Sequence, residues 1–413
     1  MRKSRREIVE KRARRDVTFL VTGATGFIGS HLAVELLNRG YRVMLLCRPN
    51  DDLTATQRVA RVFRWFGIDL GQTSRLEVIE GFIDQPLFGL TKEKYDRLVR
   101  ETDELFHCAA DTSFAERKRT RIEATNVTSV QNVLDLATAG SCYFFHHVST
   151  AYVAGKKSGY CEEAWVETQD FTNVYEETKH KGERAVLEAC SKAGLNLNIY
   201  RPSIVYGNSE TGRSTRFNAL YYPVKTVLYF KDIYKLDIEE NEGKNAENMG
   251  VRVNDGGSIH LPIRVEKGDG GGLNVIPIDF FLKACMAIME ESLDGDIFHI
   301  VNNEPTMLAD LIDYTQTLFD INGMRAVRKE DLEVVPKNAL ETVVHAYLDI
   351  YSPYMRDMRI FGTEKVDAIL SRKGVTCPKL DYDIFERCMR YAVQADWGNK
   401  LFENDPADSQ SPL

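Results

Sequence analysis

The eight residues TGATGFIG (22–29) constrain the fold of this chain more than any other stretch. They follow a short, β-branched apolar run at 17–21 and open a segment whose apolar residues recur at helical intervals. Gly23, Gly26 and Gly29 therefore stand in a strand–turn–helix context. There a glycine triplet lets the backbone approach a diphosphate, and the helix N-terminus can bind it. The pattern predicts a dinucleotide-binding unit at the start of the chain.

A rhythm of short apolar runs and helical stretches continues for about half of the chain. Further apolar runs occur at 41–47, 76–82, 103–110, 142–150 and 195–203. Strands that are apolar on both faces and alternate with helices indicate a parallel sheet that helices cover on both sides. The predicted fold class is therefore α/β, a doubly wound parallel Rossmann sheet with a smaller C-terminal substrate-binding lobe.

The end of the second apolar run selects between the two nicotinamide cofactors. NAD sites usually carry an acid there, which binds the ribose 2′-hydroxyl, but this chain has Arg48 in LLCRPN. Arg58 follows where a helix can return it to the same edge. Because a guanidinium can bind a 2′-phosphate through two hydrogen bonds, the sequence favours NADPH, although Asp51 and Asp52 stand close by.

Changes in composition divide the chain into predicted segments. The first is a basic arm with eight Lys or Arg and three acidic residues, expected to be a solvated helix or disordered. After the Rossmann unit the chain becomes aromatic-rich, then charged, then glycine-rich, which indicates a second lobe. The predicted segments are a basic N-terminal arm (1–16), an NADP-binding Rossmann domain (17–207, rejoined by 273–302), a substrate-binding lobe (208–272 and 303–401) and a disordered tail (402–413).

The overall composition is ordinary for a soluble enzyme and argues against several other classes. The net charge of −8 argues against a general nucleic-acid binder. The eight cysteines are scattered, with no C-x-x-C pair or zinc-type spacing, so we expect a reducing cytoplasm and no metal site. No segment approaches the roughly 20 apolar residues of a membrane span. A cytoplasmic location is predicted, with a peripheral membrane contact through the basic arm left open.

The stretch TNVYEETKHKGER (172–184) places Tyr175 and Lys179 four residues apart, on one face of a helix. A nearby ammonium lowers the pKa of a phenol, and a phenol so tuned can give its proton to a carbonyl oxygen. Alone, however, the stretch is typical of a solvated helix face. Its other charged residues are expected to face solvent, namely Glu176, Glu177, His180 and Lys181.

Three further stretches accompany the glycine turn in a familiar order. They are STAYVAG (149–155), YEETK (175–179) and RPSIVYG (201–207), and with them the chain resembles the extended short-chain dehydrogenase/reductase superfamily over about residues 17 to 300. Local stretches resemble its fatty acyl-CoA reductase (male-sterility-type) and carrier-protein thioester reductase branch. These are GFIDQPLFGL (81–90), His107 to Ala110, Asn126 with Val127, and Ile276 to Asp279. Phe82 replaces the usual aspartate, which leaves adenine recognition to backbone or to Asp84.

The resemblance implies a catalytic set of Thr150, Tyr175 and Lys179. Tyr175 would donate the proton, Lys179 would tune it, and Thr150 would bond the same oxygen. Asn126 and Asn173 are candidates for supporting hydrogen bonds. The implied cofactor-binding residues are Gly23, Thr25, Gly26, Phe27, Ile28, Gly29, Arg48, Arg58, Ile83, Asp84, Ala109, Ala110, Asn126, Tyr175, Lys179, Pro202 and Ile204. Three aromatic residues of the second lobe either build its core or line an apolar substrate channel: Phe217, Tyr221 and Tyr222.

The function implied is NADPH-dependent reduction of an acyl thioester, presented as acyl-CoA or on an acyl-carrier protein, to an aldehyde and in a second step to an alcohol. A carbonyl or 3-oxoacyl reductase, or a sterol-like hydroxyl oxidoreductase, uses the same three residues and remains open. A sugar-nucleotide epimerase fits less well because such enzymes usually prefer NAD. A non-catalytic NADPH-binding protein also fits less well, because such proteins often lose the Tyr or the Lys.

Overall fold

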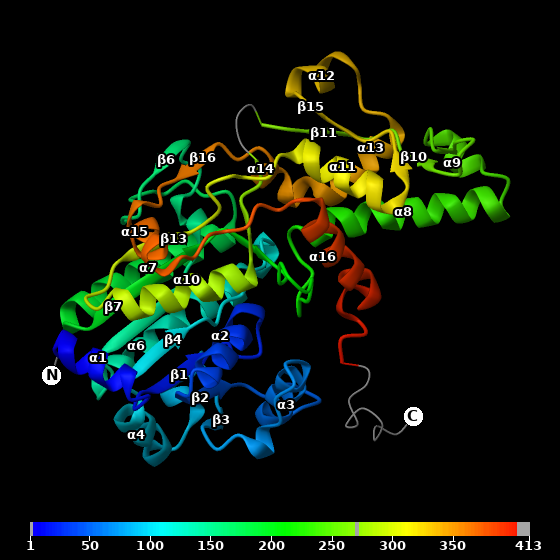
Figure 1. Cartoon of the computed structure of the whole chain (residues 1–413). Helices are drawn as coiled ribbons and strands as arrows, with labels where there is room; N and C mark the ends of the chain where they lie inside the picture. The colour runs from blue at the N-terminus through cyan, green and yellow to red at the C-terminus, as the bar shows by residue number, and fades with distance from the viewer. Residues whose placement is uncertain (1–2, 269–271, 403–413) are drawn as a thin grey trace.

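The structure, a computed structural model, describes residues 3–268 and 272–402. Seven parallel strands form its central sheet in the order β13-β7-β5-β4-β1-β2-β3 (Figure 1). They are β1 (Thr18–Thr22), β2 (Arg42–Cys47), β3 (Leu76–Glu80), β4 (Glu104–His107), β5 (Phe144–Val148), β7 (Asn196–Pro202) and β13 (Ile297–Ile300). The sheet starts at β1 and winds outward in both directions, as in dinucleotide-binding folds. The predicted fold class is confirmed.

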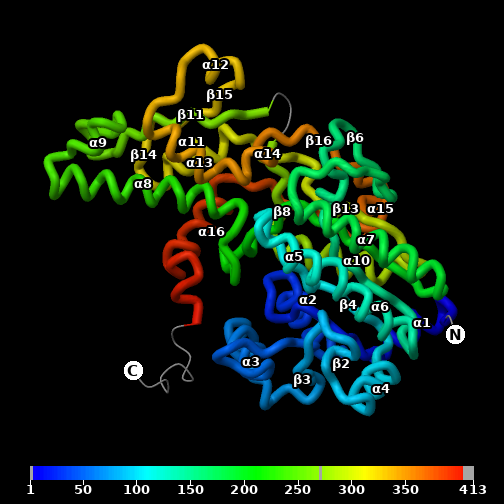
Figure 2. Tube along the Cα trace, turned by 180° about the vertical axis from the view of Figure 1, so that it is seen from behind, coloured from blue at the N-terminus to red at the C-terminus, as the bar shows by residue number. Residues whose placement is uncertain are grey.

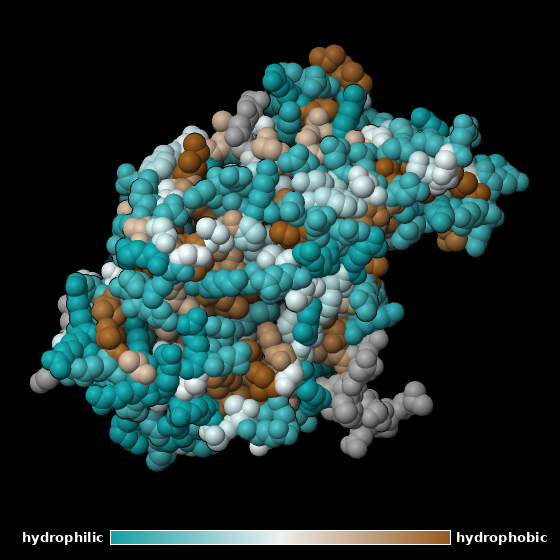
Figure 3. Space-filling view, viewed as in Figure 1, coloured by the Kyte–Doolittle hydropathy of each residue, from teal (hydrophilic) through white to brown (hydrophobic). Residues whose placement is uncertain are grey.

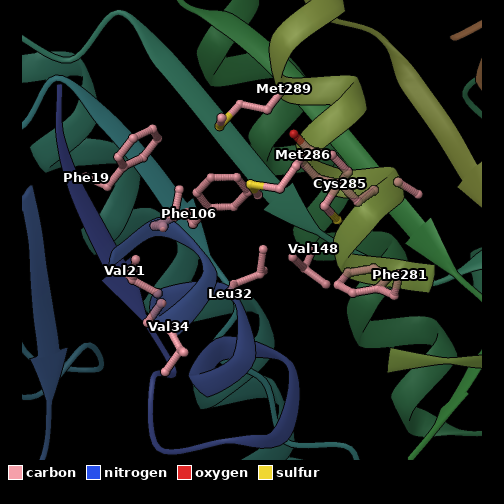
Figure 4. Close-up of a cluster of buried hydrophobic side chains, with 14 of the residues drawn as sticks. Phe19, Val21, Leu32, Val34, Phe106, Val148, Phe281, Cys285, Met286 and Met289 are labelled. Atoms are coloured by element: carbon pink, nitrogen blue, oxygen red, sulfur yellow. The ribbon is translucent and has the colours of Figure 1, made fainter. Parts of the chain in front are cut away.

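Helices cover both faces of this sheet. One face carries α2 (Phe27–Asn38), α3 (Ala55–Trp65) and α10 (Ile278–Glu291), and the other carries α4 (Lys92–Glu101), α6 (Ser129–Ala139) and α7 (Val174–Ala193). Because successive side chains of a strand point to opposite faces, Phe19 packs in the first layer and Leu20 in the second. Figure 4 shows the first layer, where Phe19 and Phe106 of the sheet lie near Met286 of α10.

The N-terminal segment differs from the predicted solvated arm. It forms α1 (Arg5–Ala13), which packs on the sheet with Ile8 buried against Phe144. The guanidinium of Arg12 is buried too, and its Nε donates to a carboxylate oxygen of Glu104 at 2.8 Å. A carboxylate that β4 places in the interior needs a cation beside it. The arm is therefore part of the folded core, and Arg12 is not available to an anionic membrane.

The second lobe lies above the sheet in Figure 1 and is seen from behind in Figure 2. Its own apolar core lies between α8, α11, α13 and short strands. The helices of the lobe are α8 (Tyr221–Glu240), α9 (Lys244–Asn248), α11 (Leu308–Phe319), α12 (Lys329–Val334), α13 (Ala339–Leu348), α14 (Ser352–Met355) and α16 (Tyr382–Gln394). The strands are β9 (Arg252–Val253), β10 (Ile259–His260), β11 (Arg264–Glu266), β14 (Ile321–Asn322) and β15 (Arg325–Val327).

Part of the predicted lobe segment 303–401 returns to the Rossmann domain, which corrects the predicted boundary. β16 (Arg359–Phe361) pairs in parallel with β6 (Gly159–Cys161). α15 (Glu364–Lys373) buries Val366, Ile369 and Leu370 in the same apolar cluster as α10. The sequence shows that α15 is amphipathic, but not which core its apolar face covers. Three shorter elements, α5 (Arg119–Glu123), β8 (Ile204–Tyr206) and β12 (Val275–Pro277), complete the domain.

The surface seen in Figure 3 is largely hydrophilic, with apolar residues in small scattered groups. Among the described residues, no helix combines the length and apolar character that crossing a bilayer requires. Of the predicted tail 402–413, only residue 402 belongs to the part that the structure describes.

Candidate active site

The glycine turn brings the end of β1 against the end of β4. Gly23 has a φ of +75°, and a Cβ there would lie 2.7 Å from the backbone nitrogen of Ala109. A Cβ on Gly29 would lie 2.3 Å from the carbonyl oxygen of Gly23. Gly26 is the N-cap of α2 and provides no side-chain cap, so the first amides of the helix can serve an anion. These residues fit a dinucleotide diphosphate.

Two of the predicted arginines meet beside this turn. One nitrogen of the Arg58 guanidinium donates to the carbonyl oxygen of Arg48 at 2.5 Å. The other approaches the hydroxyl of Thr25 at 3.3 Å. The side chain of Arg48 is exposed. The structure thus places a cationic pair at the end of β2, next to the turn that would hold the diphosphate.

The other predicted cofactor residues lie along the carboxyl ends of the strands. Ile83 and Asp84 follow β3, where the carbonyl oxygen of Ile83 accepts from the Asn132 amide at 2.8 Å and Asp84 is exposed. Ala110 follows β4, and Ile204 begins β8. This edge is where ligands bind in open parallel sheets, so the predicted set shares one edge of the sheet.

Thr150, Tyr175 and Lys179 meet at the end of β5. The hydroxyl of Thr150 lies close enough to the phenol of Tyr175 to lower its pKa, and it also approaches the carbonyl oxygen of Pro202 at 3.4 Å. Lys179 is buried, and its ammonium donates to the carbonyl oxygen of Val148 at 2.7 Å. The structure therefore gathers the three residues that the sequence singled out.

The pKa of Tyr175 shifts in the direction opposite to the expected one. Burial raises it to about 12, and the nearby hydroxyl of Thr150 lowers it only in part. The ammonium of Lys179 is bonded to Val148 and not to the phenol. Burial also lowers the pKa of Lys179 to about 8, against the opposing effect of Glu183. At neutral pH the tyrosine holds its proton, and Lys179 is charged in most molecules.

Buried polar contacts beneath the site hold α7 on the sheet. Glu183 accepts a hydrogen bond from the Ser149 hydroxyl at 2.6 Å and forms a buried ion pair with Arg201. Ser149 precedes Thr150, so this contact fixes the loop that carries the threonine. Gly182 of α7 allows close approach to the helical segment that contains Asn126, because a Cβ on Gly182 would lie 2.5 Å from the carbonyl oxygen of Asn126.

Asn126 and Asn173 form hydrogen bonds to the protein segments around the site. Asn126 lies in a π-helical turn, Ala124–Thr128, of a kind often found near functional sites. Its side-chain oxygen accepts from the backbone amide of Asp111 at 2.8 Å. Its side-chain nitrogen donates to the carbonyl oxygen of Asp111 and to the hydroxyl of Thr178, both at 2.9 Å. Asn173 caps α7 by accepting from the amide of Glu176 at 3.1 Å. Both residues thus orient the segments that carry the site.

Tyr175 faces an aromatic wall that sequence reasoning missed. The ring centroids of Tyr175 and Phe114 are 5.9 Å apart, and Tyr351 and Tyr354 lie 5.8 and 5.5 Å from Phe114. Two of these residues come from the C-terminal lobe. The aromatic-rich stretch YLDIYSPY (347–354) was the available signal, but nothing in it places the segment beside α7.

Two residues of the predicted solvent face are buried instead. Glu176 is fully buried and accepts from the hydroxyl of Tyr354 at 2.9 Å. His180 is also buried, and its Nε2 bonds the carbonyl oxygen of Val166 at 2.8 Å. The lobe and the loop before α7 cover this part of the helix. Glu177 and Lys181 do pair with each other at the surface, 2.7 Å apart.

The three predicted substrate residues lie in two different places in the structure. Phe217 and Tyr221 are buried in the core beside α16, where the Tyr221 hydroxyl accepts from the amide of Gly207. Tyr222 instead packs against Tyr351 of the aromatic wall, with the two rings tilted and 5.2 Å between their centroids. A channel lining therefore suits Tyr222, whereas the packing gives Phe217 and Tyr221 core roles.

An apolar cavity of about 70 Å³ lies inside the second lobe. Leu348 and Met355, which flank Tyr351 in sequence, belong to its wall, so the cavity lies next to the aromatic residues of the site. Thr315 is the polar exception among the lining residues, which are Leu220, Pro223, Val224, Val227, Val265, Leu273, Leu308, Leu311, Ile312, Thr315, Met324, Leu348, Met355 and Phe385. Such a wall suits an aliphatic group.

The family model described as "Male sterility protein" matches residues 21–285, which include the glycine turn and the Thr150, Tyr175 and Lys179 set. The chain belongs to the male sterility protein family. The resemblance to the male-sterility-type branch is thereby confirmed.

Solved structures and curated relatives of this family member include reductase domains. The terminal R domain of the myxalamid PKS-NRPS pathway has a TM-score of 0.71 at 22% identity, over 92% of this chain and 91% of that one. A thiolation-reductase di-domain from an archaeal non-ribosomal peptide synthetase has a TM-score of 0.67 at 21% identity, over 96% and 81%. The glycine betaine reductase ATRR of Emericella nidulans is 26% identical over 73% of this chain, and the match spans 22% of that longer protein.

Proposed function

We propose that this family member is an NADPH-dependent reductase of acyl thioesters, presented as fatty acyl-CoA or on an acyl-carrier protein. The observation that carries the proposal is the close approach of the Thr150 hydroxyl to the phenol of Tyr175, beside the buried ammonium of Lys179. Two hydroxyls that meet at one point can both bond a substrate carbonyl oxygen, and one of them can protonate it.

The protonation states support reduction. Because burial raises the pKa of Tyr175, its phenol holds a proton at neutral pH and can act as an acid. NADPH, when bound, supplies the hydride to the carbonyl carbon. Tyr175 then gives its proton to the carbonyl oxygen, and the positive charge of Lys179 stabilises the phenolate left behind. The resulting hemithioacetal loses its thiol, with the C–S electron pair and the hydroxyl proton, and leaves an aldehyde.

The arginines at the end of β2 support NADPH over NADH. An NAD site places a carboxylate there for the ribose 2′-hydroxyl. In this structure Arg58 spans from Arg48 to Thr25 at that position. A guanidinium group can bind a phosphate through two hydrogen bonds, and the opposite charges attract each other.

The lobe and the relatives support an acyl thioester as substrate. The cavity beside the aromatic wall has an aliphatic lining, as an acyl chain requires. One structural neighbour joins a reductase to a thiolation domain, which favours a carrier-bound acyl group in this chain as well. A second reduction of the aldehyde would give an alcohol through the same three residues.

A substrate panel tests this function. The purified chain is given acyl-CoA, the acyl-carrier thioester, fatty aldehyde or a ketone, each with NADPH and with NADH, and both cofactor oxidation and free thiol are followed. We expect one thiol released for each acyl thioester reduced, with NADPH preferred. Ketone reduction without thiol release from any thioester would contradict the proposal and favour an ordinary carbonyl reductase.

A further inference from the structure

The loop between β8 and α8, residues 207–220, belongs to the second lobe but is fastened to the Rossmann domain. Ser209 donates from its amide and its hydroxyl to the carboxylate of Asp279 in α10, both at 2.8 Å. The guanidinium of Arg213 lies 4.1 Å from the ring centroid of Trp65 in α3 and donates to the carbonyl oxygen of the same residue. The loop is therefore fastened to α10 and to the end of α3.

This attachment brings a further arginine, Arg216, toward the cationic pair at the end of β2. Arg58 and Trp65 are seven residues apart on α3, so they share one face of the helix and lie about 10 Å apart along its axis. Three residues of extended chain span at most about 10 Å. A loop that fastens Arg213 on Trp65 can thus place Arg216 beside Arg58.

The charges around Arg58 agree with this placement. Burial is the main cause that lowers the pKa of Arg58, and the charges of Arg48 and Arg216 lower it further. The side chains of Arg48 and Arg216 are exposed. Within the described ranges, neither of them forms a salt bridge with a carboxylate. Arg48 and Arg216, which come from two other segments, therefore both lie near enough to Arg58 to repel its guanidinium. An anion would stabilise this arrangement.

We propose that Arg216 is a third ligand of the 2′-phosphate of NADPH, supplied by the second lobe. The inference rests on the proposed NADPH preference. Arg48 and Arg58 hold the phosphate from the Rossmann domain, and Arg216 approaches it from the loop after β8. Ser214 keeps the loop in shape, because its hydroxyl donates to the carbonyl oxygen of Arg216 at 2.6 Å. The phosphate then joins the two lobes.

Binding measurements on the full chain test this role without turnover. Dissociation constants for NADP⁺ and NAD⁺ are measured for the wild type, Arg216→Gln and Arg216→Lys. We expect Arg216→Gln to weaken NADP⁺ binding by about 10- to 100-fold, the range for a charge-assisted hydrogen bond, and to leave NAD⁺ binding unchanged. Arg216→Lys should recover part of the loss, because it restores the charge but not the fork of donors.

Two further variants separate the possible outcomes. Arg252→Gln removes an exposed charge from β9 of the same lobe, and it should leave both dissociation constants unchanged. Arg48→Gln should weaken NADP⁺ binding selectively. If Arg48→Gln does so but Arg216→Gln leaves the NADP⁺ to NAD⁺ ratio at the wild-type value, the inference is overturned while the NADPH preference stands. If the wild type binds both cofactors equally, the preference itself fails.

Discussion

At the scale of the residue, the proposed proton donor lies apart from the charge proposed to stabilise the phenolate that it leaves. The pKa of Tyr175 is raised because its phenol is partly withdrawn from solvent, with Phe114 packed beside its ring. Lys179 lies one helical turn further along α7, bonded to Val148. In the reduction direction a high pKa is useful, because the phenol must still hold its proton when the substrate arrives.

Replacing Tyr175 by phenylalanine removes this proton and leaves the ring. Because a positioned general acid contributes about 10²- to 10⁴-fold, we expect kcat to fall by at least about 100-fold while the dissociation constant for NADPH stays the same. Steady-state kinetics and cofactor titration check this. Tyr229→Phe is the matched control, since Tyr229 is 53% exposed on α8, and it should be silent. Full turnover by Tyr175→Phe would refute the catalytic role.

The lowered pKa of Lys179 predicts a pH dependence of activity. With a pKa of about 8, the ammonium is present in most molecules below pH 8 and is lost above it. We expect kcat/KM to decline as the pH rises through about 8. In Lys179→Arg this decline should disappear, because a guanidinium does not titrate there, even if the rate is lower. A decline that persists unchanged in this variant would assign it to another group.

Lys179 gives the stability of the fold a pH dependence opposite in direction to that of the activity. Its folded pKa lies below the ordinary 10.5, so the folded state holds the proton less tightly than the unfolded chain. The contribution of Lys179 to the free energy of unfolding therefore rises with pH between about 8 and about 10.5. Activity and stability are expected to move in opposite directions over this range.

At the scale of the element, α1 shows how one buried charge can fasten a whole helix. Arg12 is almost fully buried, and Glu104 of β4 is completely so. His146 also approaches Glu104, at 2.9 Å. Burial raises the pKa of Glu104, but the positive charge of Arg12 outweighs this effect, and the pKa lies at about 2. The carboxylate thus depends on α1 for its main countercharge.

Arg12→Ala should leave that carboxylate buried without its partner. Breaking a buried pair in this way costs about 3–5 kcal/mol, so we expect the free energy of unfolding to fall by that amount in urea titrations. Arg14→Ala is the control, because the Arg14 side chain is 74% exposed and lies 3.7 Å from Glu10. It should change stability by less than about 0.5 kcal/mol. Equal effects of both variants would mean that α1 does not depend on the buried pair.

At the scale of the whole molecule, the second lobe completes a site that the Rossmann domain begins. It contributes Tyr351 and Tyr354 to the wall facing Tyr175 and holds the apolar cavity behind them. α15 then packs in the same apolar cluster as α10, so the chain returns from the lobe to the Rossmann domain before α16. Cofactor and acyl group would meet between the Rossmann domain and the second lobe.

Filling the cavity should change substrate preference more than stability. Val227 lines the cavity from α8 and is buried, and Val227→Phe places a ring in the empty space. We expect kcat/KM for long-chain acyl-CoA to fall at least about tenfold relative to acetyl-CoA, with a stability change within the roughly 1–3 kcal/mol of overpacking. Val253→Phe, at an exposed position of β9, is the control. An unchanged chain-length profile would show that the acyl chain lies elsewhere.

The sequence alone determined the features that depend on neighbours in the chain. The glycine turn, the alternation of strands and helices, and the spacing of Tyr175 and Lys179 are local patterns, so they predicted the fold class and the catalytic set. Contacts between distant segments do not leave such patterns. Burial decided the pKa of Tyr175, and the contact with Tyr354 hid Glu176. An interior carboxylate turned the basic arm into a packed helix. The aromatic wall and the approach of Arg216 to Arg58 were likewise decided by the tertiary structure, because side chains more than 100 residues apart meet only when the chain has folded.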